Sequence, residues 1–289
     1  MQDHQTSGPH ASIIGSRIMG NVLIHSETPR AFDAAASSYD ATYETLEGIK
    51  KLRSLTMRTF LKFFHPGERL LELNCGTGTD AVTLAKHGMT VLATDSSPLM
   101  LEEADKKIDR EDCNGKVQTQ LVPFEDLHTL SGKRFDGVYS NMGGLNCTNN
   151  LPPLAHDLAV LLRPNGYFIA IVMPSFCLWE TLAFAARAQW KHAFRRHDEN
   201  GCLAHLHGGF VQTYYHSPRK FHNAMSHDFD LVEVRGLNIF TPPPNSDRAY
   251  SALAGIIPYL HRLDELVSGF RPFSGVGDHY IMVLRRKAS

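Results

Sequence analysis

Residues 69–97, RLLELNCGTGTDAVTLAKHGMTVLATDSS, restrict the fold of this chain more than any other segment. A short apolar run leads into a turn that contains Gly76 and Gly78, and a helix-like run follows as far as Gly88. A second apolar run then ends at Asp95. This order predicts strand, turn, helix and strand. The two strands are expected to be parallel, because the helix carries the chain back across the sheet.

The alternation of apolar and helical patterns continues along the chain. Helices are expected at 97–110 and 151–166, and further strands at 116–122, 135–141, 167–173, 229–240 and 278–287. Strands separated by helices imply a parallel sheet that is covered on both faces. The sequence therefore predicts an α/β fold, doubly wound, with a mostly parallel seven-stranded sheet.

Two regions precede the first strand. Residues 1–30 mix Gly, Ser, His and Pro without sustained periodicity, and we expect them to form an N-terminal arm. Residues 31–66 show helical spacing at Phe32, Ala36 and Tyr39, which predicts a helical cap of two helices. This cap is expected to act as a cover beside the sheet.

The remaining core, residues 67–289, contains two segments that break the alternation. Residues 174–227 are rich in aromatic side chains and histidine, and residues 239–277 begin with a triple proline before a further helix. Both segments are expected to be insertions above the sheet that form a lid.

The composition limits the classes of partner. The net charge is -1 and the pI is about 7.0, so the chain lacks the basic surplus that binds phosphate backbones, and we expect no nucleic acid partner. No apolar run approaches the roughly 20 residues of a membrane span, so we expect no membrane partner. The five cysteines lack CxxC spacing, which favours reduced thiols in a cytoplasmic protein.

The glycine turn predicts a nucleotide site, because ligands bind at the carboxyl ends of the strands in doubly wound sheets. The glycines alone do not show which nucleotide binds. Ala81 stands at the third position of a dinucleotide fingerprint, where glycine is usual and alanine is also accepted. Asp95 ends the second strand, where an acid accepts hydrogen bonds from ribose hydroxyls. Glu72 and Asp80 make the turn acidic, which disfavours a pyrophosphate and favours an ammonium or sulfonium group. S-adenosylmethionine is therefore preferred to NAD.

Several segments in order resemble the motif series of class I S-adenosylmethionine-dependent methyltransferases of the small-molecule type. They are LLELNCGTGTDAVTLAKHGMTVLATDSSPLMLEEA, LVPFEDL, FDGVYSNMGGLNC and LLRPNGYFIAIVM, within residues 31–173. The lead AFDAAASSYD and the ending GDHYIMVLRRK are also similar to such proteins. The resemblance implies a Rossmann-like methyltransferase fold and methyl transfer to a small-molecule acceptor.

The resemblance also implies which residues contact the cofactor. Those near the first strand would line its amino-acid end, Asp95 the ribose, and the residues after the second and third strands the adenine. The implied set is Tyr39, Glu72, Asn74, Gly76, Gly78, Asp95, Ser96, Met100, Phe124, Glu125, Asn141 and Met142. Two positions, Asn74 and Pro123, depart from the family pattern. The contact to the adenine amine is missing at Pro123, and Glu125 or Asp126 is expected to replace it.

The acceptor site carries no motif. Aromatic residues such as Trp179, Phe184 and Trp190 in the first insertion predict a largely apolar acceptor. The cluster QTYYHS supplies the expected catalytic residues Tyr214, Tyr215 and His216, because an acceptor proton that must leave needs a base. His205, His207, His216, His222 and His227 lie close together in sequence, but no carboxylate or cysteine partner accompanies them, and we expect no metal.

Two alternative functions stay open from the sequence. The first is a non-catalytic cofactor-binding or scaffolding protein of the same fold, since binding does not prove turnover. The second is an NAD(P)-dependent oxidoreductase, which the acidic turn disfavours. Both a monomer and a homodimer are compatible with the sequence.

Overall fold

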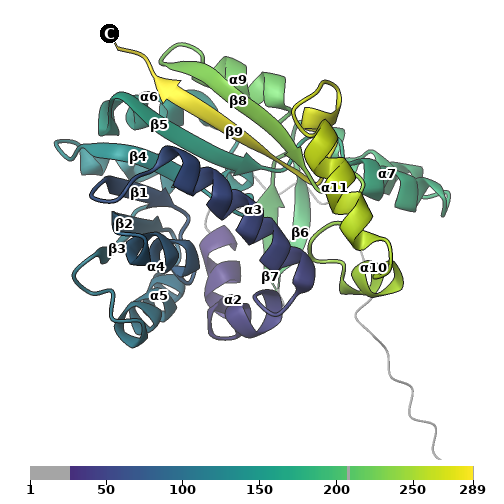
Figure 1. Ribbon diagram of the computed structural model, residues 1–289, viewed down its shortest axis with the longest axis horizontal. Coiled ribbons are helices and arrows are strands. Elements are labelled where there is room, and N and C mark those ends of the chain that lie inside the picture. The colour runs from purple at the N-terminus through teal and green to yellow at the C-terminus, as the bar shows by residue number, and fades with distance from the viewer. Residues whose placement is uncertain (1–26, 207–208, 289) are drawn as a thin grey trace, which may run out of the picture.

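The computed structural model describes residues 27–206 and 209–288 (Figure 1). Most of the expected N-terminal arm, residues 1–26, lies outside the described residues, as does His207. The described chain begins with helix α2 (Glu27–Tyr43), which starts inside the segment expected to be the arm. Helix α3 (Glu47–Phe63) completes the expected two-helix cap.

One seven-stranded sheet forms the centre of the molecule, as Figure 1 shows. Its strand order is β3-β2-β1-β4-β5-β9-β8. The first five of these strands are parallel, and β9 runs antiparallel to both β5 and β8. The strands are β1 (Arg69–Leu73), β2 (Thr90–Asp95), β3 (Val117–Leu121), β4 (Phe135–Ser140), β5 (Leu162–Val172), β8 (Phe229–Leu237) and β9 (His279–Arg286). The expected doubly wound, mostly parallel sheet is confirmed.

Helices cover both faces of the sheet, because the strands are apolar on both sides. Leu70 of β1 joins a core with α3, α4 (Thr79–Lys86) and α5 (Pro98–Arg110). Leu71 joins the opposite core with α6 (Leu151–Leu161) and α9 (Pro218–Met225). This alternation within one strand follows from the two-residue period of β-structure.

Short helical segments follow two of the strands at their carboxyl ends. The 3-10 helix η1 (Phe124–Leu130) comes after β3, and η2 (Gly144–Cys147) comes after β4. Both lie where the sequence predicts ligand contacts.

The first insertion contains a β-hairpin that the sequence pattern did not predict. Helices α7 (Leu178–Ala185) and α8 (Trp190–Ala193) are followed by η3 (Arg195–His197), and then by β6 (Cys202–Leu206) and β7 (Gly209–Thr213). These two strands form a separate antiparallel sheet that contacts α2. A Cβ at Gly209 would lie 2.7 Å from the Cβ of Ala31, so the hairpin packs closely on α2. The hairpin depends on this remote partner, which a local sequence pattern does not reveal.

The second insertion contains α10 (Asp247–Ala252), α11 (Ile257–Val267) and η4 (Phe273–Gly275). Within the described part of the chain, no helix has both the length and the apolar composition needed to cross a membrane.

Candidate functional site

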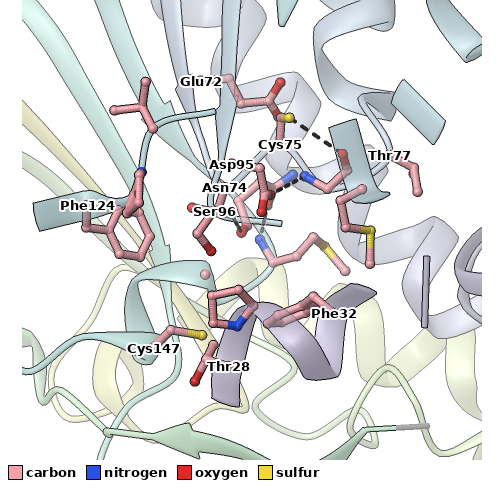
Figure 2. Close-up of a pocket in the computed structure, with 18 of the residues that line it drawn as sticks. Thr28, Phe32, Glu72, Asn74, Cys75, Thr77, Asp95, Ser96, Phe124 and Cys147 are labelled. Atoms are coloured by element: carbon pink, nitrogen blue, oxygen red, sulfur yellow. Dashed lines mark hydrogen bonds between the residues drawn. The ribbon is translucent and has the colours of Figure 1, made fainter. Parts of the chain in front are cut away.

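A cavity of about 520 Å³ lies at the carboxyl ends of β1, β2 and β4. Figure 2 shows Thr28 and Phe32 of α2 on one side of this cavity and Glu72 and Asp95 on the other. The loop after each of these strands supplies further lining residues, and so does the start of η1. The cavity therefore occupies the place that a doubly wound sheet uses for ligands.

The turn after β1 brings the backbone to the cavity wall. Asn74 and Gly76 both have positive φ, at 51° and 53°. The Asn74 side chain is held by neighbours at the end of β4 and just after it: its Oδ1 accepts from Ser140 Oγ at 2.6 Å and its Nδ2 donates to the Asn141 carbonyl at 3.0 Å. Asparagine tolerates this backbone conformation better than most residues, which gives a physical reason for its presence at this position.

Gly78 lies at the start of α4 and does not line the cavity. Its φ is 75°, and a Cβ at this position would lie 3.0 Å from the Cβ of Ala104 in α5. The expectation that Gly78 contacts the ligand is therefore not supported by its position. The glycine instead allows α4 and α5 to approach each other.

Asp95 connects the glycine turn to the end of β2. Its Oδ2 accepts from the Gly76 amide at 2.8 Å, and its Oδ1 accepts from the Ser97 amide at 2.9 Å. Burial raises the pKa of Asp95, while these backbone hydrogen bonds oppose the increase. Each carboxylate oxygen has a second lone pair, so Asp95 can still accept from a hydroxyl group of a ligand.

Glu72 is buried at the end of β1 and faces the cavity. Among the described residues, its Oε2 has no hydrogen-bond partner. Burial raises the pKa of Glu72 well above the ordinary value, and the nearby negative charge of Asp80 raises it further. A cationic donor in the cavity would provide the missing partner and would favour the charged carboxylate.

Arg53 of α3 contributes a positive charge to the same end of the cavity. It donates to Asp80 Oδ1 at 2.5 Å and to Glu44 Oε1 at 2.6 Å, while its buried Nε has no partner within the described chain. Asp80 also accepts from Asn141 Nδ2 at 2.8 Å. This network joins α3, α4 and the loop after β4, and it presents both signs of charge to a ligand.

Helix α2 covers the cavity and is attached by two carboxylates. Asp33 accepts from Ser97 Oγ at 2.6 Å and from the Leu99 amide at 3.1 Å. Asp40 accepts from Thr77 Oγ1 at 2.6 Å, and its other oxygen lies 2.7 Å from Lys107 Nζ. These contacts place Thr28, Pro29, Phe32 and Tyr39 along the cavity wall.

The structure brings together eleven of the twelve residues that the sequence assigned to the cofactor. The lining residues among them are Tyr39, Glu72, Asn74, Gly76, Asp95, Ser96, Met100, Phe124, Glu125, Asn141 and Met142. Pro123, which departs from the family pattern, and Asp126, an expected replacement for the contact to the adenine amine, also line the cavity. The sequence interpretation missed Arg53, Thr28 and Cys147. The helical spacing of α3 predicted its existence, but not which of its polar side chains faces the cavity.

The three expected catalytic residues do not line this cavity. His216 is fully buried, and its Nε2 donates to the Thr148 carbonyl at 2.9 Å. Burial lowers the pKa of His216. Tyr215 lies beneath Arg196, and the amide of Tyr214 donates to the Asn146 carbonyl at 2.7 Å. These positions indicate that the QTYYHS segment supports the loop after β4 rather than contacting an acceptor in this cavity.

A buried ionic cluster lies at the start of β9. Arg196 donates to both Glu180 and Asp278 at 2.7 Å, and His279 Nδ1 lies 2.9 Å from the other oxygen of Asp278. Although burial opposes ionisation, the charges of His279 and Arg196 lower the pKa of Asp278. Cys177, Glu180 and Asp278 are close enough to share a metal ion, but Arg196 already forms ion pairs with both carboxylates.

Comparisons with known proteins agree with this geometry. Residues 70–166 match a family model described as "Methyltransferase domain". A demethylmenaquinone methyltransferase from Tropheryma whipplei (strain Twist) is 26% identical over 161 residues, which span 54% of this chain and 64% of that protein. This chain therefore matches less than two thirds of the length of that curated relative.

Two solved structures share the fold at low sequence identity. The DhpI-SAH complex has a TM-score of 0.56 and 14% identity, covering 93% of this chain and all of that one. The [4+2]-cyclase SpnF has a TM-score of 0.53 and 14% identity, with 82% of both chains covered. At this identity the likeness establishes the fold alone.

Proposed function

Because the chain carries a methyltransferase domain at residues 70–166, we propose that it binds S-adenosylmethionine in the cavity and transfers the methyl group to a small, largely apolar molecule. The observation that carries this proposal is the unpartnered carboxylate oxygen of Glu72, which lies in the same cavity as Asp95 and Arg53. A ligand with an ammonium group, a carboxylate and a ribose matches these three side chains.

The residues at the β1 end fit the amino-acid part of this cofactor. Glu72 would accept from the ammonium group, and Arg53 would attract the carboxylate. Asp80 and Asn141 would keep Arg53 in place through their hydrogen bonds. The site also disfavours a pyrophosphate, because Glu72 and Asp80 place negative charge beside the turn.

The other end of the cavity fits a ribose and a flat base. Asp95 would accept from the ribose hydroxyls, since its oxygens keep free lone pairs. Phe124, the first residue of η1, and Met100 supply apolar contacts in this part of the cavity. Glu125 and Asp126 stand at the edge of this region and would accept from the exocyclic amine of adenine.

When bound, S-adenosylmethionine supplies a methyl group that is activated by its positively charged sulfur. The chain then has to position an acceptor in line with that group and to exclude water. Met142, Cys147 and Phe32 present mostly apolar surface to the cavity, which supports an apolar acceptor. No side chain is assigned as a base, because the three expected candidates lie outside the cavity.

The proposal is tested by ligand-dependent stability and by product formation. S-adenosylhomocysteine should raise the free energy of unfolding by about 2.7 kcal/mol at a concentration of about 100 times its Kd, whereas NAD at the same concentration should have no effect. Stabilisation by NAD alone would contradict the proposal and favour the oxidoreductase. Incubation with a labelled methyl donor and an extract of apolar metabolites should then yield a labelled small molecule.

A second candidate function is a cofactor-dependent protein that transfers no methyl group. The observation that favours it is the shared fold with SpnF, which is described as a cyclase. Such a protein would bind S-adenosylhomocysteine but would release no labelled product and would leave the donor unconsumed. The two measurements together therefore separate methyl transfer from binding alone.

A further inference from the structure

Two buried oxygen atoms on neighbouring strands lack hydrogen-bond partners among the described residues. One is Oε2 of Glu72 in β1, and the other is Oη of Tyr139 in β4. The two residues are register partners on adjacent parallel strands, and their exposed fractions are 2% and 0%. An unpaired buried oxygen costs free energy, and phenylalanine in place of Tyr139 would avoid that cost. The hydroxyl is therefore expected to gain a partner in another state of the site.

Both side chains point to the same face of the sheet. Leu70 of β1 packs on the face that α3 covers, and Glu72, two positions later, points to that face as well. The ring of Tyr139 packs on Phe60 of α3, with 4.8 Å between the ring centroids. Figure 1 shows α3 lying across this face of the sheet. The carboxyl group and the hydroxyl group therefore share the space between the sheet and α3.

The other polar groups around Glu72 already have partners or another task. Burial raises the pKa of Glu72 and Asp80 raises it further, whereas the Tyr139 hydroxyl and Arg53 oppose the increase. Arg53 donates to Asp80 and to Glu44, and in the proposed complex it attracts the carboxylate of the ligand. The hydroxyl of Tyr139, in contrast, has no acceptor within the described part of the chain.

We propose that Tyr139 is a positioning residue for the ligand site: its hydroxyl donates a hydrogen bond to the carboxylate of Glu72 while the ammonium group of the ligand binds that carboxylate from the cavity. The inference rests on the proposed function, because that function assigns the ammonium group to Glu72. A carboxylate offers about four acceptor positions, so the two contacts do not compete. The hydroxyl proton stays on Tyr139, and any proton that Glu72 loses on ionisation goes to the solvent.

This hydrogen bond would fix the orientation of the carboxylate and stabilise its charged form. Hydrogen bonds to a charged acceptor are stronger than those between neutral groups. The contribution of Tyr139 therefore depends on a ligand that carries an ammonium group, and a ligand without this group should not gain from it.

The experiment compares two ligands by isothermal titration calorimetry. S-adenosylhomocysteine carries the ammonium group, whereas methylthioadenosine keeps the adenine, the ribose and the thioether but lacks the amino-acid part. Tyr139→Phe removes only the hydroxyl oxygen and should weaken the binding of S-adenosylhomocysteine by about tenfold or more, because a hydrogen bond to a charged group is lost. Its affinity for methylthioadenosine should equal that of the unchanged protein.

Tyr280→Phe is the matched control. Tyr280 is also a fully buried tyrosine of the central sheet, but it does not line the cavity, and its hydroxyl donates to the His216 carbonyl at 3.0 Å. This variant loses a buried hydrogen bond and should lose stability, while its affinity for both ligands should stay unchanged. The comparison separates the position of Tyr139 from the general effect of removing a buried hydroxyl group.

A double-mutant cycle tests whether Tyr139 acts through Glu72. Glu72→Gln removes the charged acceptor but keeps the size of the side chain. In this background Tyr139→Phe should have a much smaller effect on the binding of S-adenosylhomocysteine, because residues that act on each other are not additive.

The inference is overturned if Tyr139→Phe leaves the affinity for S-adenosylhomocysteine unchanged, if it weakens both ligands equally, or if the cycle is additive. In each of these cases, binding of S-adenosylhomocysteine by the unchanged protein leaves the proposed function standing. An unchanged protein that does not bind S-adenosylhomocysteine would instead contradict the proposed function, and this inference would fail with it.

Discussion

Asp95 combines a structural role with a position on the cavity wall. Its oxygens accept from the amides of Gly76 and Ser97, which fixes the turn after β1 relative to the end of β2. The same side chain lines the cavity. Close by, Glu72 also lines the cavity, and its buried Oε2 has no hydrogen-bond partner among the described residues. The two acids are therefore expected to respond differently to a ligand: Asp95 would add hydrogen bonds to an existing set, and Glu72 Oε2 would gain a hydrogen-bond partner that it lacks.

Asp95→Ala is expected to weaken the binding of S-adenosylhomocysteine by about 1–3 kcal/mol, because hydrogen bonds to a charged acceptor are lost. Isothermal titration calorimetry measures the change. Asp109→Ala is the matched control, since Asp109 is an exposed acid on the neighbouring helix α5. An unchanged affinity in a folded Asp95→Ala protein would remove Asp95 from the ligand site.

Binding of S-adenosylhomocysteine is expected to release a proton from Glu72. The pKa of Glu72 is raised by burial in the free protein, and the ammonium group of the ligand would lower it again. The bound state then holds fewer protons than the free state, so affinity should increase as the pH rises through the raised pKa. Calorimetry in two buffers with different ionisation enthalpies counts the proton. Glu72→Gln should abolish the buffer dependence, and a buffer-independent enthalpy for the unchanged protein would refute the linkage.

The turn between β1 and α4 contributes both to helix packing and to the cavity wall. Its two glycines both have positive φ, but their surroundings differ. A Cβ at Gly76 would meet no atom within 4 Å, whereas a Cβ at Gly78 would meet Ala104 of α5. Gly76 therefore faces open space in the cavity, and Gly78 lies in a contact between helices. Helix α2 contacts this turn through Asp40, which accepts from Thr77 Oγ1 at 2.6 Å.

Gly78→Ala is expected to lower the free energy of unfolding by about 1–3 kcal/mol, because positive φ is strained for alanine and the new methyl group crowds Ala104. Gly76→Ala shares the strain without the crowding, so its loss of stability should be smaller and its loss of ligand affinity larger. Urea unfolding and calorimetry separate these two effects. Equal stability losses for both variants would contradict the distinct positions of the two glycines.

At the scale of the whole molecule, packing on the side of α9 and β9 buries the titratable side chain of His216. His216 packs near Phe221 of α9, and its backbone carbonyl accepts from Tyr280 Oη at 3.0 Å. Since burial lowers the pKa of His216, the folded chain binds a proton there less readily than the unfolded chain does. The contribution of this site to stability is present above the ordinary histidine pKa and is lost as the pH falls towards the lowered value.

The contribution of His216 to the midpoint of urea unfolding is therefore expected to fall as the pH is lowered from about 7.5 to about 5.5. His216→Gln should show a smaller decrease over this range, because glutamine does not titrate and still carries a donor for the Thr148 carbonyl. His227→Gln is the control, since the His227 side chain is 92% exposed. If His216→Gln keeps the full pH dependence, the buried histidine is not its source.

The sequence by itself determined the features that depend on neighbours along the chain. Strand, glycine turn and helix followed from the apolar period and from turn chemistry around Gly76. The helix expected to begin near residue 97 does begin there, where Ser97 caps α5 by accepting from the Met100 amide at 3.1 Å. The mostly parallel, doubly wound character of the sheet also followed, because helical connections between strands permit few topologies.

Only the tertiary structure decided which remote side chains share the cavity. Arg53 meets Asp80 across 27 positions in sequence, and His216 meets Thr148 across 68. Tertiary packing placed Arg53 at the cavity and buried His216. The sequence pattern predicted His216 at the acceptor site and did not assign Arg53 to the cavity. The same packing set Gly78 against Ala104. Such contacts depend on how whole elements are packed against one another, and the local periods and turn signals of a sequence carry no information about those distances.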